Sequence, residues 1–251
     1  MRIFTPLFVA VLVGCGAGSP AATQTSSSDL RHKGDADQAG PNPMLYPKTA
    51  QPYGKPMYRW AELMWSYIYS IAPDQNPFFD TSGEFCAVNQ DGPVWFLPAV
   101  PGSTLGNNIS RSCTIPQDKS IMLQMSSAVN DYPCPEPPPF EPAPGQSLYD
   151  FLISFISPLF DNVSGFTVTL DGVNINDPLS YRFTSPAVFN FSPSLAMVAF
   201  DSCITQTDMK GVVDGFYLLF KPMPPGQHTI VLIGHDMEGV PVTLTEHLTV
   251  Q

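Results

Sequence analysis

The chain has 251 residues, a length that allows one large all-β domain or two smaller ones. Acidic residues outnumber basic residues by 22 to 11, and the formal net charge is −11. Because no basic run could neutralise phosphates, this balance argues against nucleic acid or an anionic membrane face as a partner. The 28 prolines favour loops and strand ends over long helices.

The first 14 residues have the pattern of an export signal. Arg2 is followed by an apolar run, residues 3–13, that is too short to span a bilayer. The end of this run, Leu-Val-Gly-Cys at residues 12–15, resembles a bacterial lipoprotein signal. The resemblance implies cleavage before Cys15, lipidation of that cysteine and attachment of the protein to a membrane through it.

The residues after Cys15 bear on where the protein is delivered and how it is held. Gly16, not an aspartate, follows the cysteine, and in a double-membraned bacterium the lipoprotein resemblance then implies delivery to the outer membrane. An ordinary secretory signal cut near Ala17 or Ala22 is the alternative. Residues 15–51 are mostly small and polar with almost no apolar periodicity, and they predict a flexible tether.

Two amphipathic helices are expected. The first runs from Met57 to about Ser70, after Pro56 and before Pro73, with an apolar stripe at three- and four-residue steps. The stripe predicts packing on a sheet. A ligand-stacking role is the alternative for three of the aromatic residues of the helix, Trp60, Trp65 and Tyr69. The second helix covers residues 147–160, with Ser147 as N-cap and Asp150 as its capping partner.

The stretch Thr81–Pro98 is the most distinctive run of the chain. Its Asp91-Gly92 pair permits the positive φ of a hairpin turn, and Val-Trp-Phe-Leu at residues 94–97 has the composition of a buried strand. We expect a hairpin here, held by a disulfide and covered by the first helix.

Four cysteines remain if Cys15 is lipidated, an even set that predicts two disulfides in an exported protein. Three connectivities are open. We favour Cys86–Cys113, which brackets the expected hairpin, and Cys134–Cys203 by elimination. Metal binding is disfavoured because there is no Cys-x-x-Cys and no histidine beside a cysteine pair.

The second half of the chain changes to a period of two. Strands are expected at residues 166–170, 173–175, 181–183, 188–191, 216–220, 228–233 and 240–250, with Asp171-Gly172 as a hairpin turn. Short strands between Gly and Pro turns predict a mainly β fold, a β-sandwich of immunoglobulin-like or jelly-roll topology with one or two packed helices. Residues 52–251 then form a single disulfide-bonded domain, and a division near the proline-rich segment 132–146 stays open.

Several motifs together resemble a family of uncharacterised exported bacterial proteins. They are Tyr53-Gly54-Lys55, the Trp-containing helix, Gly83–Ala87, Gly92–Leu97, Pro224–Ile230 and His247–Val250. The chain departs from the family pattern after Pro116, where Gln117–Met122 replaces an Ala-Gly-Lys and Phe-Phe-Pro pattern. The family has no established activity, so the resemblance implies no catalytic residues and no cofactor.

Candidate chemistry is sparse. If Met237 and Glu238 form the tip of the last hairpin, His228 faces His247 on the outer side, and the two could hold a metal or act as an acid–base pair. Hydrogen bonding to loops or water is the alternative for such histidines. In this register Val231 and Ile233 face the core, and Glu246 shares their apolar face.

The aspartates allow one further metal hypothesis. Asp161, Asp171 and Asp177 could bind calcium, but their spacing matches no calcium loop and each lies where a turn would use an aspartate. Nucleophile-elbow, Walker, Rossmann and zinc-protease patterns are absent from the sequence.

These observations support two functional hypotheses. The first is a membrane-anchored cell-envelope lipoprotein acting as a binding or structural module, with an envelope protein or a glycan as partner. The second is an exported hydrolase acting on envelope polysaccharide, in which Asp201, Asp208 or Asp214 would lie near His228. The lack of catalytic patterns favours the first.

Overall fold

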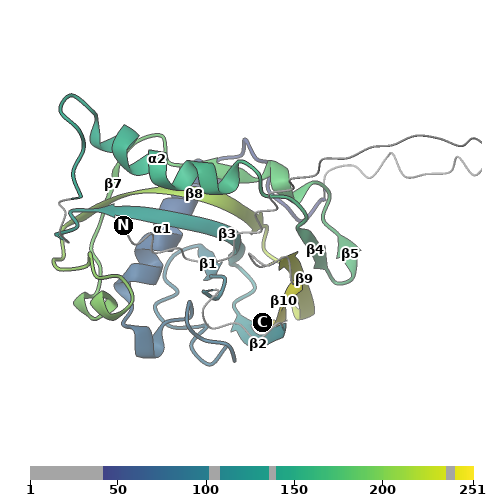
Figure 1. Cartoon of the computed structure of the whole chain (residues 1–251). Helices are drawn as coiled ribbons and strands as arrows, with labels where there is room; N and C mark the ends of the chain where they lie inside the picture. The colour runs from purple at the N-terminus through teal and green to yellow at the C-terminus, as the bar shows by residue number, and fades with distance from the viewer. Residues whose placement is uncertain (1–41, 102–107, 136–139, 236–240) are drawn as a thin grey trace, which may run out of the picture.

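The computed structural model describes residues 42–101, 108–135, 140–235 and 241–251. Ten strands form two mixed sheets, and two α-helices pack on them (Figure 1). The fold is a β-sandwich with packed helices, as the sequence predicted. Short 3-10 helices connect the elements at Pro52–Gly54 (η1), Pro73–Gln75 (η2), Pro178–Ser180 (η4) and Leu195–Ala199 (η5).

The first sheet has the order β1-β3-β8-β6, and β7 also pairs with β8. Its strands are β1 (Val94–Leu97), β3 (Ser120–Tyr132), β6 (Arg182–Thr184), β7 (Phe189–Phe191) and β8 (Met209–Phe220). β1 runs parallel to β3, and the other pairs are antiparallel. β3 and β8 are buried over most of their length, because both faces of this sheet are covered.

The second sheet has the order β2-β10-β9-β4-β5. Its strands are β2 (Asn108–Ile115), β4 (Thr167–Leu170), β5 (Val173–Asn174), β9 (Gly226–His235) and β10 (Pro241–Val250). β2 and β10 are parallel, and the other pairs are antiparallel. Buried and exposed residues alternate along β2 and β10, so one face of this sheet lies against the core and the other is open.

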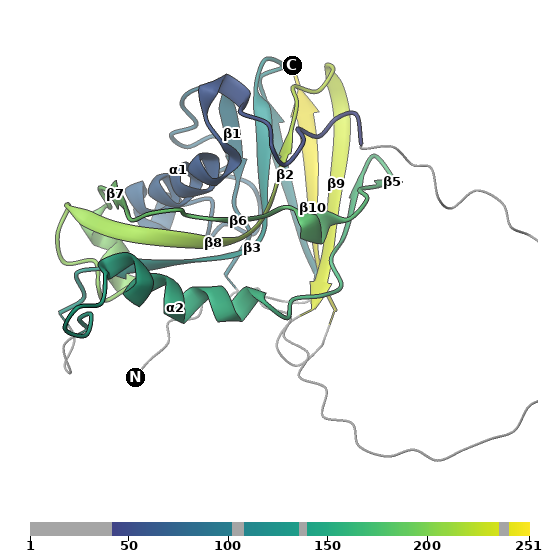
Figure 2. The ribbon, with the colours of Figure 1, turned by 90° about the horizontal axis from the view of Figure 1, so that it is seen from above.

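Helices α1 (Met57–Ser70) and α2 (Leu148–Phe160) lie on opposite faces of the first sheet (Figure 1). The strands of the second sheet cross the direction of β3 and β8 (Figure 2). The second sheet and α2 lie on the same face of the first sheet, and α2 covers the part of it that the second sheet leaves free (Figure 2). One core contains α2 and both sheets, and a second core contains α1 and the other face of the first sheet. Trp60, Trp65 and Tyr69 are buried in the second core, so they pack there and do not present a ligand platform.

Both helices have the predicted bounds within one residue. Asn76 is fully buried beyond the end of α1, and its amide donates to the carbonyl oxygens of Ile68 and Ile71 at 2.7 and 2.9 Å. Ser147 caps α2 by accepting a hydrogen bond from the Asp150 amide at 3.0 Å. No helix among the described residues is long and apolar enough to cross a membrane.

The predicted hairpin in Thr81–Pro98 is wrong. β1 pairs in parallel with residues 120–123 of β3, and the residues before β1 form turns. Neither β2 nor β3 was predicted as a strand. β3 carries apolar and small polar residues on both faces and lacks a period of two. β2 does alternate, but a charged residue, Arg111, stands on its buried face. The strand expected at residues 216–220 is longer than predicted. β8 begins at Met209 and continues through Asp214-Gly215, opposite a register shift between Gln124 and Ser126 of β3.

The ordered domain begins before the expected end of the tether at residue 51. Leu45 is buried and forms a bridge to Phe220, the last residue of β8. Tyr46 donates its amide to the Leu219 carbonyl at 2.9 Å. This short pairing satisfies the open side of β8 where β6 ends, so the tether hypothesis applies only to residues before 42, which lie outside the described residues.

Candidate functional site

The structure does not bring the two candidate histidines together. His228 is paired with Leu248, and His247 with Thr229. Because successive residues of a strand point to opposite faces, this register places the two histidines on opposite faces of the second sheet. Five residues, 236–240, separate the two strands; this odd number shifts the register by one residue from that of a two-residue tip at Met237 and Glu238.

The same shift corrects the expected faces of the hairpin. On β9 the buried side chains are Ile230 and Leu232, while Val231 and Ile233 point to the open side. On β10 the buried face is the predicted one, and Glu246 belongs to it. The predicted faces were therefore wrong for β9 and right for β10.

His228 instead forms a structural pair with Asp171 at the β4–β5 turn. Its Nδ1 lies 2.7 Å from Asp171 Oδ2 and its Nε2 lies 2.9 Å from the Pro224 carbonyl oxygen. Both ring nitrogens face acceptors, so the arrangement suits the doubly protonated imidazolium. Burial opposes that charge, but the hydrogen bonds to Asp171 and Pro224 outweigh it and raise the pKa of His228.

The three candidate calcium ligands are not brought together. Asp161 binds Arg182 at 2.8 Å, while Asp171 binds His228 and also accepts from the Thr229 amide at 2.8 Å. Asp177 has a left-handed backbone conformation immediately before η4. The turn interpretation of these residues therefore holds.

The three acids of the hydrolase hypothesis are held by other partners. Asp214 is fully buried in β8 and accepts from Arg182 Nε at 3.0 Å and from Arg182 Nη2 at 2.7 Å. Arg182 also donates to the Ser157 carbonyl of α2, so this pair fastens the helix to the sheet. Asp208 is exposed, and Asp201 belongs to a separate buried cluster.

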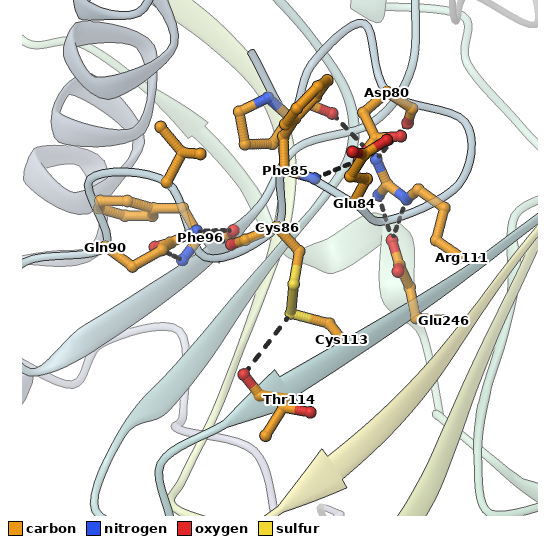
Figure 3. Close-up of a disulfide and its surroundings, with 12 residues drawn as sticks. Asp80, Glu84, Phe85, Cys86, Gln90, Phe96, Arg111, Cys113, Thr114 and Glu246 are labelled. Atoms are coloured by element: carbon orange, nitrogen blue, oxygen red, sulfur yellow. Dashed lines mark hydrogen bonds and ion pairs between the residues drawn. A yellow bond between two sulfur atoms is a disulfide. The ribbon is translucent and has the colours of Figure 1, made fainter. Parts of the chain in front are cut away.

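A buried ion pair joins the second sheet to the Thr81–Pro98 stretch. Arg111 of β2 and Glu246 of β10 are neighbours in the parallel register, and the guanidinium binds the carboxylate through Nε and Nη2 (Figure 3). The remaining donors reach the carbonyl oxygens of Pro98 at 2.7 Å and Pro77 at 3.2 Å. The apolar face therefore tolerates Glu246 because every charge near it has an opposite or dipolar partner.

The Thr81–Pro98 stretch is fixed by a disulfide and by one glutamine. Cys86 and Cys113 are bonded, with their Cα atoms 5.9 Å apart (Figure 3). Gln90 accepts from the Phe96 amide at 2.9 Å and donates to the Phe96 carbonyl at 2.7 Å, so its side chain replaces a neighbouring strand along the edge of β1. These contacts give the stretch a structural role.

A cluster of acids lies where α1, β3 and the loop after η5 meet. Asp131 and Asp201 are both buried, and ligand atoms of their carboxylates lie within 4.8 Å of each other. Asp201 Oδ2 accepts from the Tyr69 hydroxyl at 2.8 Å, and its Oδ1 accepts from the Cys203 amide at 3.0 Å. Asp131 Oδ2 is buried without a hydrogen-bond donor. Burial raises the pKa of Asp131 well above its ordinary range, and the charge of Asp201 raises it further.

The second disulfide holds these two acids together. Cys134 and Cys203 are bonded, with Cα atoms 4.4 Å apart, and they follow Asp131 and Asp201 by three and two residues. The Cys203 sulfur is near both carboxylates, but as part of a disulfide it is not a thiolate ligand. Two carboxylates supply at most four oxygens, fewer than the roughly six to eight ligands of calcium. The raised pKa of Asp131 therefore fits a protonated carboxyl better than a metal ligand. Both disulfides are the predicted pairs, and they indicate a protein that folds outside the reducing cytoplasm.

The open face of the second sheet carries hydroxyl groups in registered rows. We call it the hydroxyl face. It comprises Asn108, Ser110, Ser112 and Thr114 of β2, Thr243, Thr245, His247 and Thr249 of β10, Thr229, Val231 and Ile233 of β9, and Thr167 and Thr169 of β4. In one central row Ser110, Thr245, Val231 and Thr169 lie side by side. Each of these side chains is exposed or half-buried, and none is an acid, a lysine or an arginine.

Sequence reasoning placed Thr243, Thr245 and His247 on the outer face of the last hairpin. It did not predict the face as a whole, because β2 was not expected and the faces of β9 were exchanged. Cys15 lies outside the described residues. Comparisons with protein-family models, with curated proteins and with solved structures find no match for this chain.

Proposed function

We propose that this protein is a membrane-anchored lipoprotein of the cell envelope that acts as a binding or structural module. The Leu-Val-Gly-Cys pattern at residues 12–15 supports the anchor, with the outer membrane as its site in a double-membraned bacterium. Two disulfides fit an envelope location. The resemblance to exported bacterial proteins points the same way.

The observation that carries a binding role is the hydroxyl face. An open, regular sheet surface without charges is available to a partner, whereas the buried Arg111, Glu246 and Asp214 are engaged in ion pairs within the domain. The hydrolase alternative depends on acids near His228, and Asp201, Asp208 and Asp214 are not among the hydrogen-bond partners of His228 in the described part of the chain.

The anchor is tested by growing cells with a labelled fatty acid and comparing the wild type with Cys15→Ser. We expect label and membrane fractionation in the wild type and neither in the variant, because the acyl chains would be joined to this residue. Cys86→Ser combined with Cys113→Ser is the control: it removes cysteines but should keep the label. Equal labelling of wild type and Cys15→Ser would refute the anchor.

A further inference from the structure

The hydroxyl face has a composition unlike the rest of the molecule. The protein carries a formal charge of −11, yet thirteen outward positions on four adjacent strands include no acid, lysine or arginine. A charged partner gains nothing from complementary charges on such a surface. Threonine and serine hydroxyls both donate and accept, so they match a partner whose own groups do the same.

The face is also rigid. Within it, β10 is paired on both sides, by β2 in parallel and by β9 in antiparallel register. β-Branched side chains such as Thr245 and Val231 have few rotamers, so little side-chain entropy is lost when a ligand binds. Threonine methyl groups and the side chains of Val231 and Ile233 add apolar contact between the hydroxyls.

The extent of the face argues against a second copy of the chain as its occupant. Four strands about 4.8 Å apart and three two-residue steps of about 6.8 Å each give roughly 300 to 400 Å². A stable protein interface covers about 800 Å² per partner. A narrow, uncharged ligand with many hydroxyl groups fits this area and chemistry better.

We propose that the hydroxyl face binds a neutral polysaccharide, laid across β2, β10, β9 and β4. The sugar hydroxyls exchange hydrogen bonds with Ser110, Thr245 and Thr169, and the carbon-bound hydrogens of the sugar rings rest on Val231 and the threonine methyl groups. This proposal rests on the binding role proposed above and adds the ligand class and the site.

The test uses the full-length chain and measures retention on insoluble cellulose, chitin and mannan, with alginate as a charged counterpart. We expect at least one neutral polymer to retain the wild type and alginate not to. Thr245→Arg places a long charged side chain in the centre of the face and should weaken retention at least tenfold. Thr245→Val removes only the hydroxyl and should weaken it about fivefold, the effect of one hydrogen bond of about 1 kcal/mol.

Two further variants control the measurement. Thr205→Arg makes the same change at an exposed threonine outside the second sheet and should leave retention unchanged. Ser110→Arg, on the exposed edge strand β2, replaces Thr245→Arg if that variant does not fold. Failure of all three neutral polymers to retain the wild type, or equal retention of the wild type and the folded arginine variants, would overturn the proposal. Fatty-acid labelling tests the lipid anchor independently of polysaccharide binding, so failure of either proposal can be told apart from failure of the other.

Discussion

Two clusters of buried ionisable residues in this domain differ in how the cost of burying their charges is offset. Arg111 and Glu246 are buried together, and their charges are opposite. Asp131 and Asp201 are buried together, and both are acids. Burying a charge is costly unless it is paired, so the first cluster is neutralised by the chain itself and the second needs a proton from solution.

The difference makes one cluster a fixed part of the fold and the other sensitive to conditions. The guanidinium of Arg111 also reaches the carbonyl oxygens of Pro77 and Pro98, which ties three segments together. The acids instead depend on the Cys134–Cys203 disulfide to hold them close and on the Tyr69 hydroxyl as a donor. Two predictions test this comparison, and a third extends it to the partly exposed pair of His228 and Asp171.

The largest effect is expected at the ion pair. Arg111→Met leaves Glu246 buried without its partner and should lower the free energy of unfolding by about 3 to 5 kcal/mol. Adding Glu246→Leu should recover much of that loss, because an apolar pair of similar volume needs no neutralisation. Urea denaturation measures both. Lys210→Met removes an exposed charge from β8 and serves as the control, with an expected change within about 0.5 kcal/mol. A loss below about 1 kcal/mol for Arg111→Met would contradict the assigned role.

A smaller effect of opposite sign is expected at the acid pair. The folded state raises the pKa of Asp131 above its unfolded value. The folded protein therefore binds more protons than the unfolded chain, and its stability falls as the pH rises from about 4 through the raised pKa. Asp131→Asn keeps the shape without the charge, and should stabilise the protein above that pKa by about 1 to 3 kcal/mol, the usual cost of a buried polar group without a partner.

The measurement is the thermal unfolding midpoint at several pH values between 4 and 9. The wild type should lose stability relative to Asp131→Asn as the pH rises. Asp208→Asn changes an exposed aspartate and is expected to follow the wild type. Parallel curves for the wild type and Asp131→Asn would contradict a raised pKa of Asp131 in the folded protein.

The smallest effect is expected at His228, which is partly open to solvent and loses much of its pairing energy to water. Its folded pKa is raised, so the contribution is complete below the unfolded pKa near 6.5 and is lost as the pH rises through the folded pKa. His228→Gln should cost less than about 1 kcal/mol at pH 5 and nothing at pH 9. His247→Gln, at an exposed position on the other face, should show no such dependence. A pH-independent difference would mean that His228 acts by packing alone.

Local patterns predicted much of the fold. Pro56 precedes α1 and Pro73 follows it, Ser147 caps α2, and Asp171-Gly172 forms the turn between β4 and β5. Each signal lies within a few residues of the element that it specifies, so it can be recognised in a single sequence without knowledge of distant contacts.

The errors concern partners distant in the chain. Val94–Leu97 is a strand as predicted, but it pairs with residues 120–123 and not with its neighbours in the sequence. The register of β9 and β10 depends on the length of the connection between them, and an error of one residue exchanged the faces of β9. The acid pair was missed because Asp131 and Asp201 are 70 residues apart, and only Cys134–Cys203 hinted that they meet.

The sequence by itself determined the two helices, the Asp171-Gly172 turn and the β-rich class, because propensity, caps and turn residues act locally. Cysteine parity predicted two disulfides, but their pairing stayed a preference among three connectivities until the structure showed it. The tertiary structure decided which buried acid has a basic partner, which one has a raised pKa, and which hydroxyl groups form one face. Those properties depend on register and on the approach of distant strands. Pairing of Arg111 with Glu246, of Asp131 with Asp201, and of Ser110 with Thr245 joins residues between 70 and 135 positions apart in the chain.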